Sequence, residues 1–448
     1  MNRVLNRMGP PQILVLGFAV LILVGAVLLS LPVASASGTA TNFLDALFTA
    51  TSALCVTGLV VVDTASHWSM FGQIVILLLI QIGGLGIMTF AAFFALLLRK
   101  KIGLKERLLL QEALNKLSVS GVVKLVQQIL LTTFIIESAG AVILTLRFIK
   151  DMPLAKAIKY GIFHSISAFN NAGFDLFGTV TGKFSSLTAY ANDPVVSLTV
   201  AFLFIIGGLG FSVIVVLTQT RCKKDLNLHA KSVITTSLGL LAFGFTIISI
   251  IEWNNPATMG NLSVGSKLLS AFFSSATPRT AGFNTLDTAG LMIPTQFLLI
   301  LLMFIGASPG STGGGIKTTT FAAVFYSARA TLLGKEEPTA FERRVPRETL
   351  DKALAVTFVA FIWVTFVTLI LTVSEHADFL TTLFETTSAF GTVGLSLGLT
   401  TELSILGKIM ITLTMFLGRL GPLTLVFAIA QRRRKCKIRY PEEQLMIG

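Results

Sequence analysis

Charged side chains are scarce in this chain. Asp, Glu, Lys and Arg make up 13% of the 448 residues, whereas hydrophobic residues make up 53%. Soluble domains carry about twice that share of charge. The mean hydropathy of +0.80 excludes an ordinary soluble protein, because so few charges could not keep so much apolar surface in solution. The composition therefore predicts a membrane protein with several spans.

Cysteine and histidine are also rare. Three cysteines, Cys55, Cys222 and Cys436, are too few and too scattered for a disulfide or metal framework, and the four histidines show no metal-ligand spacing. A phosphate-binding Gly-Lys-Ser/Thr loop is missing as well. The sequence therefore indicates a protein that is not an enzyme and that has no organic cofactor. We expect any nucleotide control to come from another chain.

Long apolar runs are what the sequence has in abundance. Eight of them reach the roughly 20 residues that cross a bilayer. They lie near 13–32, 71–98, 123–148, 195–219, 233–252, 294–330, 352–374 and 403–430. The eight runs form four successive pairs, and one shorter apolar segment lies between the two runs of each pair. These segments are at 43–54, 158–169, 267–277 and 379–390. The short segments predict re-entrant helices, with surface amphipathic helices as the alternative.

A glycine follows each short segment. The intervals between these glycines are 115, 109 and 112 residues, and a phenylalanine stands ten positions before each one. The glycines are Gly58, Gly173, Gly282 and Gly394. A serine stands six positions before three of them, and Ala276 holds that place in the third unit. The matched offsets predict a fourfold internal repeat.

The repeat predicts an all-α membrane protein. We expect four helix–pore-helix–helix units around a central pore, with eight transmembrane spans and four re-entrant pore helices. The predicted units are 1–100, 101–222, 223–335 and 336–448.

The residues that lead into each repeat glycine are candidates for a cation filter. A dehydrated cation needs oxygens in place of water, and an extended backbone supplies carbonyls along an axis. Glycine permits the positive φ that turns a carbonyl toward the ion, and the short helices would direct their negative C-terminal ends to the centre. Ordinary helix-ending glycines are the alternative. The candidate K+ filter residues are Val56, Thr57, Gly58, Asn171, Ala172, Gly173, Thr280, Ala281, Gly282, Thr392, Val393 and Gly394.

A second glycine cluster lies within the second long run of each unit. In the first two units, at 83–86 and 207–210, close helix packing is the favoured interpretation. In the third unit the segment at about 306–317 cannot remain helical, which favours a mobile constriction below the filter over a static kink. The candidate gate residues are Gly306, Ser308, Gly310, Ser311, Thr312, Gly313, Gly314, Gly315 and Arg419. We expect Lys317 to extend to the cytoplasmic surface.

Arg419 stands 13 residues before the basic run that begins at Arg432, so on a helix it would lie ~20 Å inside the membrane face. Buried arginines at this depth usually face a cavity or a partner. Three roles are open: a tether for the 306–317 segment, a charge that lowers cation occupancy in the pore, or an ion pair with an acid such as Glu385.

The basic residues explain the net charge of +13 without nucleic acid. Five basic groups fall on one side of the membrane if the spans alternate, which predicts that both termini are cytoplasmic. The groups lie at 3–7, 99–107, 221–231, 343–352 and 432–439. Four more basic residues fall on the outer side: Arg147, Lys150, Lys156 and Lys159. We interpret those four as anchors at lipid headgroups, with an influence on the pore mouth as the alternative.

At these glycines and at Arg419 the chain resembles the superfamily of potassium transporters that includes Trk, Ktr and the plant HKT proteins. The resemblance covers essentially the whole chain and is strongest to the bacterial Ktr membrane subunits. It implies a potassium filter with four glycines, a gating loop after Gly306, and the buried arginine of the last helix at Arg419. It also implies a homodimer that sits on a cytosolic ring of RCK-type, nucleotide-binding regulatory subunits of the KtrA kind.

Two functions remain open on this sequence. The first is a channel-like potassium uptake subunit of the bacterial plasma membrane, driven by the membrane potential and gated by a regulatory partner. The second is a secondary carrier that couples K+ to Na+ or H+. Carriers usually show inverted or twofold repeats and acidic residues at the midplane. The fourfold repeat of one sense favours the first.

Overall fold

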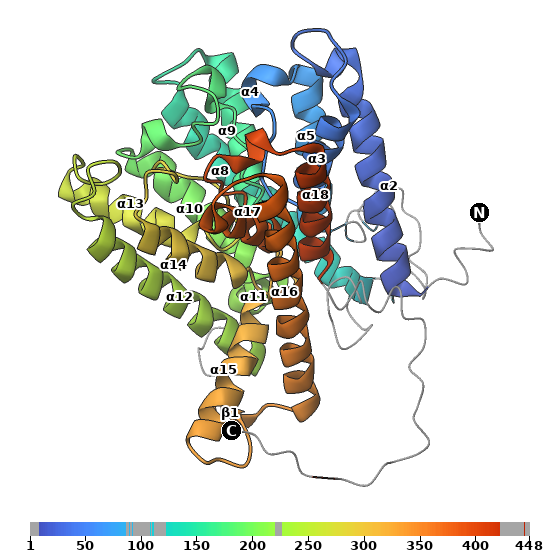
Figure 1. The fold of residues 1–448 in the computed structure, drawn as a ribbon, viewed down its shortest axis with the longest axis vertical. Helices are drawn as coiled ribbons and strands as arrows, with labels where there is room; N and C mark the ends of the chain where they lie inside the picture. The colour runs from blue at the N-terminus through green and yellow to red at the C-terminus, as the bar shows by residue number, and fades with distance from the viewer. Residues whose placement is uncertain are drawn as a thin grey trace.

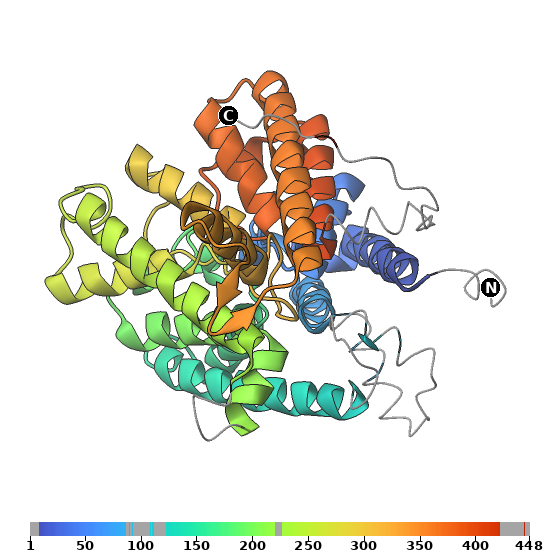
Figure 2. The ribbon, with the colours of Figure 1, turned by 90° about the horizontal axis from the view of Figure 1, so that it is seen from below.

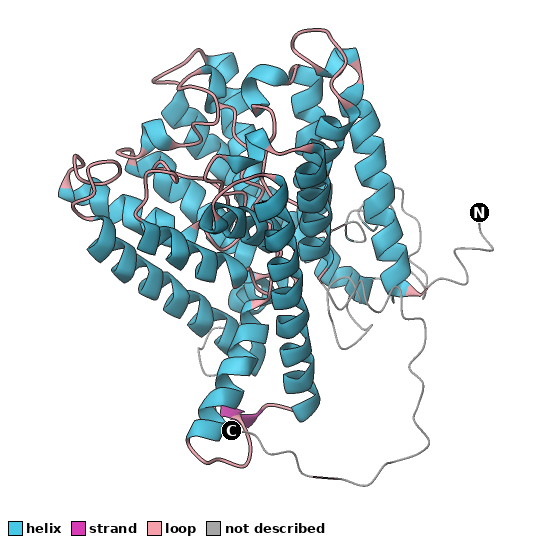
Figure 3. Cartoon of the chain, in the orientation of Figure 1, coloured by secondary structure: helices cyan, strands magenta, loops and turns pink. Residues whose placement is uncertain are grey.

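The computed structural model describes residues 9–86, 122–219 and 226–421, together with the single positions 89, 92, 108, 110, 111 and 443. The fold is almost entirely helical (Figure 3). Several predicted features lie outside the described residues. These are the distal parts of the runs at 71–98 and 403–430, most of the basic groups at 3–7, 99–107, 221–231 and 432–439, Cys222, Cys436, and the unit boundaries at 100 and 222.

Within the described ranges, four long helices are apolar enough to cross a membrane, and they are the first predicted span of each unit. They are α2 (Pro10–Ser30), α8 (Val122–Phe148), α12 (Leu228–Glu252) and α16 (Arg347–Ser374). Much of their apolar surface is exposed, as at Phe134, Phe243 and Phe358, as expected for helices in contact with lipid.

Four shorter helices coincide with the predicted re-entrant segments. They are α3 (Phe43–Leu54), α9 (Leu154–Phe169), α13 (Val264–Ala276) and α17 (Phe379–Gly391). Phe48 and Phe384 are fully buried within two of them, so these helices do not lie on the surface as amphipathic helices would. Side chains cap two of the N-termini: Leu44 N donates to Asn42, and Ser266 N donates to Ser263.

The second helix of every unit ends at or near a glycine. The sequence marked a break in the third unit, and in the other units α5, α10 and α18 end at a glycine with positive φ: Gly86, Gly210 and Gly421. Their bounds, with those of the third unit's pair, are α5 (Met70–Leu85), α10 (Pro194–Leu209), α14 (Ile293–Phe304), α15 (Thr318–Leu332) and α18 (Ile405–Leu420). After Gly210 the chain turns by 100° into α11 (Phe211–Gln219).

The units close into a ring. Each second helix packs on the short helix of the next unit: α5 on α9, α10 on α13, α14 on α17, and α18 back on α3. Seen from below, the four units follow one another around a centre in the order of the sequence (Figure 2). The short helices meet near this centre, which is where the repeat glycines lie.

The two ends of the molecule differ (Figure 1). The upper end in Figure 1 carries most of the loops and short helices of the first two units. Their bounds, with that of one from the fourth unit, are η1 (Pro32–Ala34), α4 (Thr64–His67), η2 (Phe177–Thr179), η3 (Thr188–Tyr190) and η5 (Leu399–Glu402). At the lower end, α15 and α16 project together and are joined by a hairpin of β1 (Thr339–Ala340) and β2 (Arg343–Arg344).

Candidate functional site

The backbone at the four repeat glycines has the same conformation in every unit. Each glycine has a φ between +69° and +93°. The residue two positions before it also has a positive φ, although none of these residues is glycine: Val56, Asn171, Thr280 and Thr392. Positive φ is uncommon outside glycine and costs energy, so four occurrences at one repeat position indicate a shared structural demand.

The four glycines form a closed ring, which we call the glycine ring. A methyl group on Gly58 would lie 2.6 Å from the carbonyl oxygen of Ala172, and one on Gly173 would lie 3.0 Å from that of Ala281. A methyl group on Gly282 would collide with Val393 O, and one on Gly394 with Thr57 O. Each glycine therefore faces the carbonyl of the next unit, and the fourth unit returns to the first. Carbonyl oxygens arranged in this way can replace the water of a monovalent cation.

Side chains from the short helices support the ring. In the first and fourth units, Gly58 N and Gly394 N donate to the serine six positions earlier, Ser52 or Ser388, at 3.1 Å. In the second unit, Ser167 Oγ donates to Phe174 O at 2.7 Å. The third unit has alanine at this position, and the neighbouring Thr277 donates to Phe283 O instead. We did not identify Thr277 from the sequence, although the exception at Ala276 pointed to this place.

The 306–317 loop lies directly beneath the glycine ring. Three consecutive loop residues face three different units: Thr312 Oγ1 lies 3.0 Å from the Asn171 amide, Gly313 packs against Thr280, and Gly314 packs against Thr392. The Asn171 amide also lies 3.1 Å from Thr280 Oγ1. The loop therefore covers the lower side of the ring in the second, third and fourth units.

The shortened second helices hold this loop in place. A helix that ends leaves carbonyls without partners, and the loop uses these carbonyls. Ser308 N donates to Gly208 O at 3.1 Å, Thr312 N to Gly207 O at 3.3 Å, and Gly315 N to Gly418 O at 3.3 Å. The expected close packing is present too, because a methyl group on Gly83, Gly207 or Gly418 would collide with the carbonyl at the end of a short helix.

Arg419 joins the loop to the first unit. Its guanidinium donates to Thr312 O on the loop and to Gly83 O at the end of α5. The ion pair with Glu385 is not found among the described residues, because Glu385 instead accepts hydrogen bonds from Ser396 and Thr400. The position of Arg419 thus matches the tether among the three roles that the sequence left open.

Lys317 does not extend to the surface as predicted. Its Nζ turns back and donates to Gly313 O at 2.8 Å and to Gly314 O at 3.4 Å. The sharp turn of the loop, with Gly315 at a φ of +67°, brings these two carbonyls within reach of the side chain. A second cationic group therefore stands with Arg419 in the layer below the glycine ring.

A hollow of about 250 Å³ opens on the other side of the ring, and we call it the outer hollow. All four ring glycines line it, as do three aspartates: Asp63, Asp175 and Asp287. Among the described residues, no Lys, Arg or His lines it. The described residues thus place an acidic hollow on one side of the glycine ring, and the 306–317 loop with two cationic side chains on the other.

Comparison with known proteins agrees with this arrangement. The family described as "TrkH: Cation transport protein" matches residues 12–435. The chain belongs to the TrkH family of cation transport proteins. The crystal structure of the potassium transporter TrkH from Vibrio parahaemolyticus superposes on this TrkH-family chain with a TM-score of 0.70 at 18% identity, over 93% of this chain and 83% of the other. That likeness confirms the predicted fold.

Two curated relatives carry the name Ktr system potassium uptake protein B. The protein from Bacillus subtilis is 46% identical over 99% of this chain and 97% of its own length. The protein from Vibrio alginolyticus is 42% identical over 98% and 95%. These relatives confirm the predicted resemblance to Ktr membrane subunits. They are named as transport proteins, which confirms that this TrkH-family chain is a transporter rather than an enzyme.

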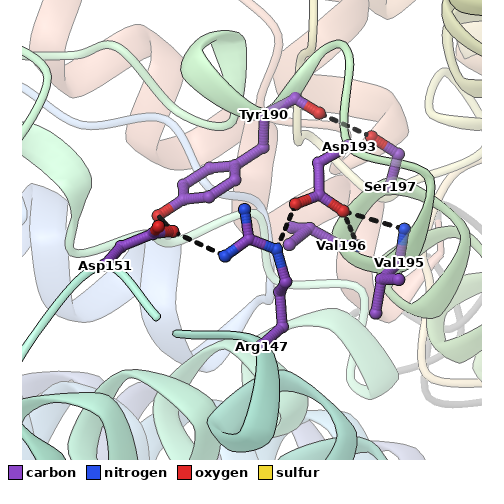
Figure 4. Close-up of polar contacts among 7 residues, drawn as sticks. All are labelled: Arg147, Asp151, Tyr190, Asp193, Val195, Val196 and Ser197. Carbon is purple, nitrogen blue, oxygen red and sulfur yellow. Dashed lines mark hydrogen bonds and ion pairs between the residues drawn. The ribbon is translucent and has the colours of Figure 1, made fainter. Parts of the chain in front are cut away.

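One of the outer basic residues of this TrkH-family chain has protein partners that the sequence did not indicate. Arg147 pairs with Asp151 at 2.8 Å and with Asp193, and it lies against the ring of Tyr190 (Figure 4). Asp193 also caps α10, because Val195 N donates to it at 2.9 Å. Arg147 therefore ties the end of α8 to the start of α10.

Proposed function

We propose that this chain is the ion-conducting membrane subunit of a potassium uptake system. K+ would lose its water in the outer hollow, pass the carbonyls of the filter residues at 56–58, 171–173, 280–282 and 392–394, and move down the membrane potential. The observation that carries the proposal is the closed glycine ring, with the same pair of positive φ angles in every unit. The names of the two Ktr relatives support potassium as the ion.

We propose further that the 306–317 loop and Arg419 form the gate. The loop lies under the second, third and fourth units, and Arg419 connects it to the first unit through Gly83 O. Backbone without regular structure persists at membrane depth only beside protein or water, and here it lies against both the filter strands and the pore axis. Opening then requires the loop to leave the carbonyls of Gly207, Gly208 and Gly418.

The remaining parts of the proposal concern the assembly. We place the chain in the bacterial plasma membrane as a multi-pass protein with both termini cytoplasmic, because the hairpin end carries Arg343, Arg344 and Arg347. We propose a homodimer and a cytosolic ring of RCK-type, nucleotide-binding subunits, as the family resemblance implies. The relatives are named as one protein of a system, which supports a partner.

Cation flux into liposomes that contain the purified chain tests the proposed function. The parent should admit K+ and Rb+ in preference to Na+ and Li+, without any Na+ or proton gradient. Gly58→Ser should lose this discrimination, because its side chain would strike Ala172 O. Gly38→Ser is the matched control: Gly38 also has a positive φ, of +71°, but has no atom within 4 Å.

Either of two results would contradict the proposal. Flux that needs a Na+ or proton gradient would establish the alternative carrier. Discrimination that survives Gly58→Ser would remove the glycine ring from the ion path.

A further inference from the structure

The position two residues after each ring glycine faces the outer hollow in every unit. The four residues at this position differ in chemistry: Val60, Asp175, Asn284 and Ser396. Only Asp175 carries a charge. The fourfold repeat therefore places one carboxylate two residues after a ring glycine, whereas the three matching positions of the other units are neutral.

Among the described residues, no Lys or Arg side chain pairs with this carboxylate, whereas several other carboxylates do have such a partner. Asp45 pairs with Lys408 at 2.7 Å, and Asp151 and Asp193 both pair with Arg147 (Figure 4). No ion pair reaches Asp175 in the described part of the chain, and its one hydrogen bond comes from Phe177 N, at 2.9 Å to Oδ1.

The other two aspartates of the outer hollow are less suited to meet an ion at the ring. Asp63 is already held by three hydrogen bonds, because it accepts from Ser66 N and Ser66 Oγ in its own unit and from Phe184 N in the second unit. Asp287 is exposed to solvent and stands five residues beyond its ring glycine. Asp175 is the acidic residue nearest in sequence to the ring.

We propose that Asp175 is a rate-determining residue of the ion path, which draws monovalent cations to the glycine ring when they are dilute. This inference rests on the proposed function. A narrow, low-dielectric mouth that carries charge of one sign raises the local concentration of counter-ions. The neutral residues at the matching positions leave the path open, so the charge raises the rate of access without adding a tight site that would slow release.

Asp175→Asn tests the charge alone, because an asparagine Oδ1 can still accept the hydrogen bond from Phe177 N. In liposomes we expect the initial rate of Rb+ uptake to fall about threefold at Rb+ concentrations far below half-saturation. At saturating Rb+ we expect no change. An impermeant salt should remove the difference, because it screens the charge. Asp151 lies in the ion-paired cluster of Figure 4, and Asp151→Asn should take up Rb+ at the same initial rate as the parent.

A charge swap separates an electrostatic role from a structural one. The double variant Asp175→Asn/Asn284→Asp moves the carboxylate to the matching position of the third unit, and we expect it to recover the uptake of the parent. An Asp175→Asn variant equal to the parent, a deficit that persists at high ionic strength, or a swap without recovery would each overturn the inference. If the parent conducts passively and selects K+, such a result overturns this inference alone. A parent without passive flux would overturn the proposed function as well.

Discussion

The glycine ring and the layer beneath it follow opposite designs. In the ring all four units supply the same backbone, with the same positive φ values and the same contact from each glycine to the next carbonyl. Beneath it the units differ: the third gives the 306–317 loop, the fourth gives Arg419, the second gives the Asn171 amide and acceptor carbonyls, and the first gives an acceptor carbonyl at Gly83.

The difference follows from what each layer must do. An ion on an axis is held equally by carbonyls from every side, so repetition suits the ring. A barrier that opens needs one part that can move and others that stay in place. The four units therefore contribute different groups to the layer beneath the glycine ring. The hydrogen bonds of that layer join the loop to helix ends, and Arg419 also joins α18 to the end of α5.

Breaking the symmetry of the ring should have the largest effect. Gly282 has a φ of +76°, and Gly282→Ala would bring a methyl group against Val393 O. The left-handed backbone costs about 1–2 kcal/mol for alanine and overpacking adds about 1–3 kcal/mol. We therefore expect K+ flux into liposomes to fall about a hundredfold. Gly38→Ala, with a similar φ and free space, should conduct like the parent. Flux that survives Gly282→Ala would show that the ring is not tight.

Removing the tether from the unequal layer should have the opposite sign. Arg419→Met eliminates the hydrogen bonds to Thr312 O and Gly83 O, and each bond to a charged group contributes about 1.5–3 kcal/mol. We expect basal K+ flux without a partner to rise about tenfold, with K+ still preferred over Na+. Arg344→Gln, on the exposed hairpin, is the control for loss of one positive charge. A fall in flux would contradict the gate.

Thr312→Val should produce a smaller increase of the same kind. The hydroxyl contacts the Asn171 amide, and an ordinary hydrogen bond contributes about 0.5–1.5 kcal/mol. We expect basal flux to rise about fourfold, measured in the same liposomes. Thr331→Val is a suitable control, because the Thr331 hydroxyl donates only to Ser327 O within α15. If Thr312→Val conducts like the parent, the loop is held by its backbone alone.

Ser388→Ala should have the smallest effect and should change selectivity rather than gating. It removes the acceptor for Gly394 N, which lies 3.1 Å away, and so loosens one strand of four. We expect the preference for K+ over Na+ to fall about threefold, since one neutral hydrogen bond contributes about 1 kcal/mol. Ala276→Ser, at the equivalent place in the third unit, should leave the ratio unchanged because Thr277 already supports that strand. If Ser388→Ala leaves the preference for K+ over Na+ unchanged, the strand at Gly394 is held by its backbone rather than by the Ser388 hydroxyl.

The symmetric part of the molecule was the part that the sequence predicted well. A backbone conformation that is needed four times leaves four glycines at one offset, and the short helices must precede them. The positive φ at Val56, Asn171, Thr280 and Thr392 could not be predicted, because none of these side chains marks it and the surrounding fold imposes it. The candidate filter and gate residues stay predictions until flux is measured.

The asymmetric contacts were harder to predict, because they join side chains to distant backbone. Nothing in the sequence near Arg419 indicates that its partner is the carbonyl of Gly83, which lies 336 residues away. Lys317 was predicted wrongly for a similar reason, since its direction depends on the turn of the loop rather than on its distance from the helix end. The ion pair of Arg147 was not predicted, because its partner Asp193 follows 46 residues later.

The contact of α18 with α3 has a consequence for synthesis of the protein. Lys408 pairs with Asp45 across 363 residues, so the wall around the axis is complete only after the last unit has left the ribosome and entered the bilayer. Until then, Asp45 on the first short helix has no Lys408 to pair with. A nascent chain that has not yet gained α18 lacks the contact that closes the ring of units.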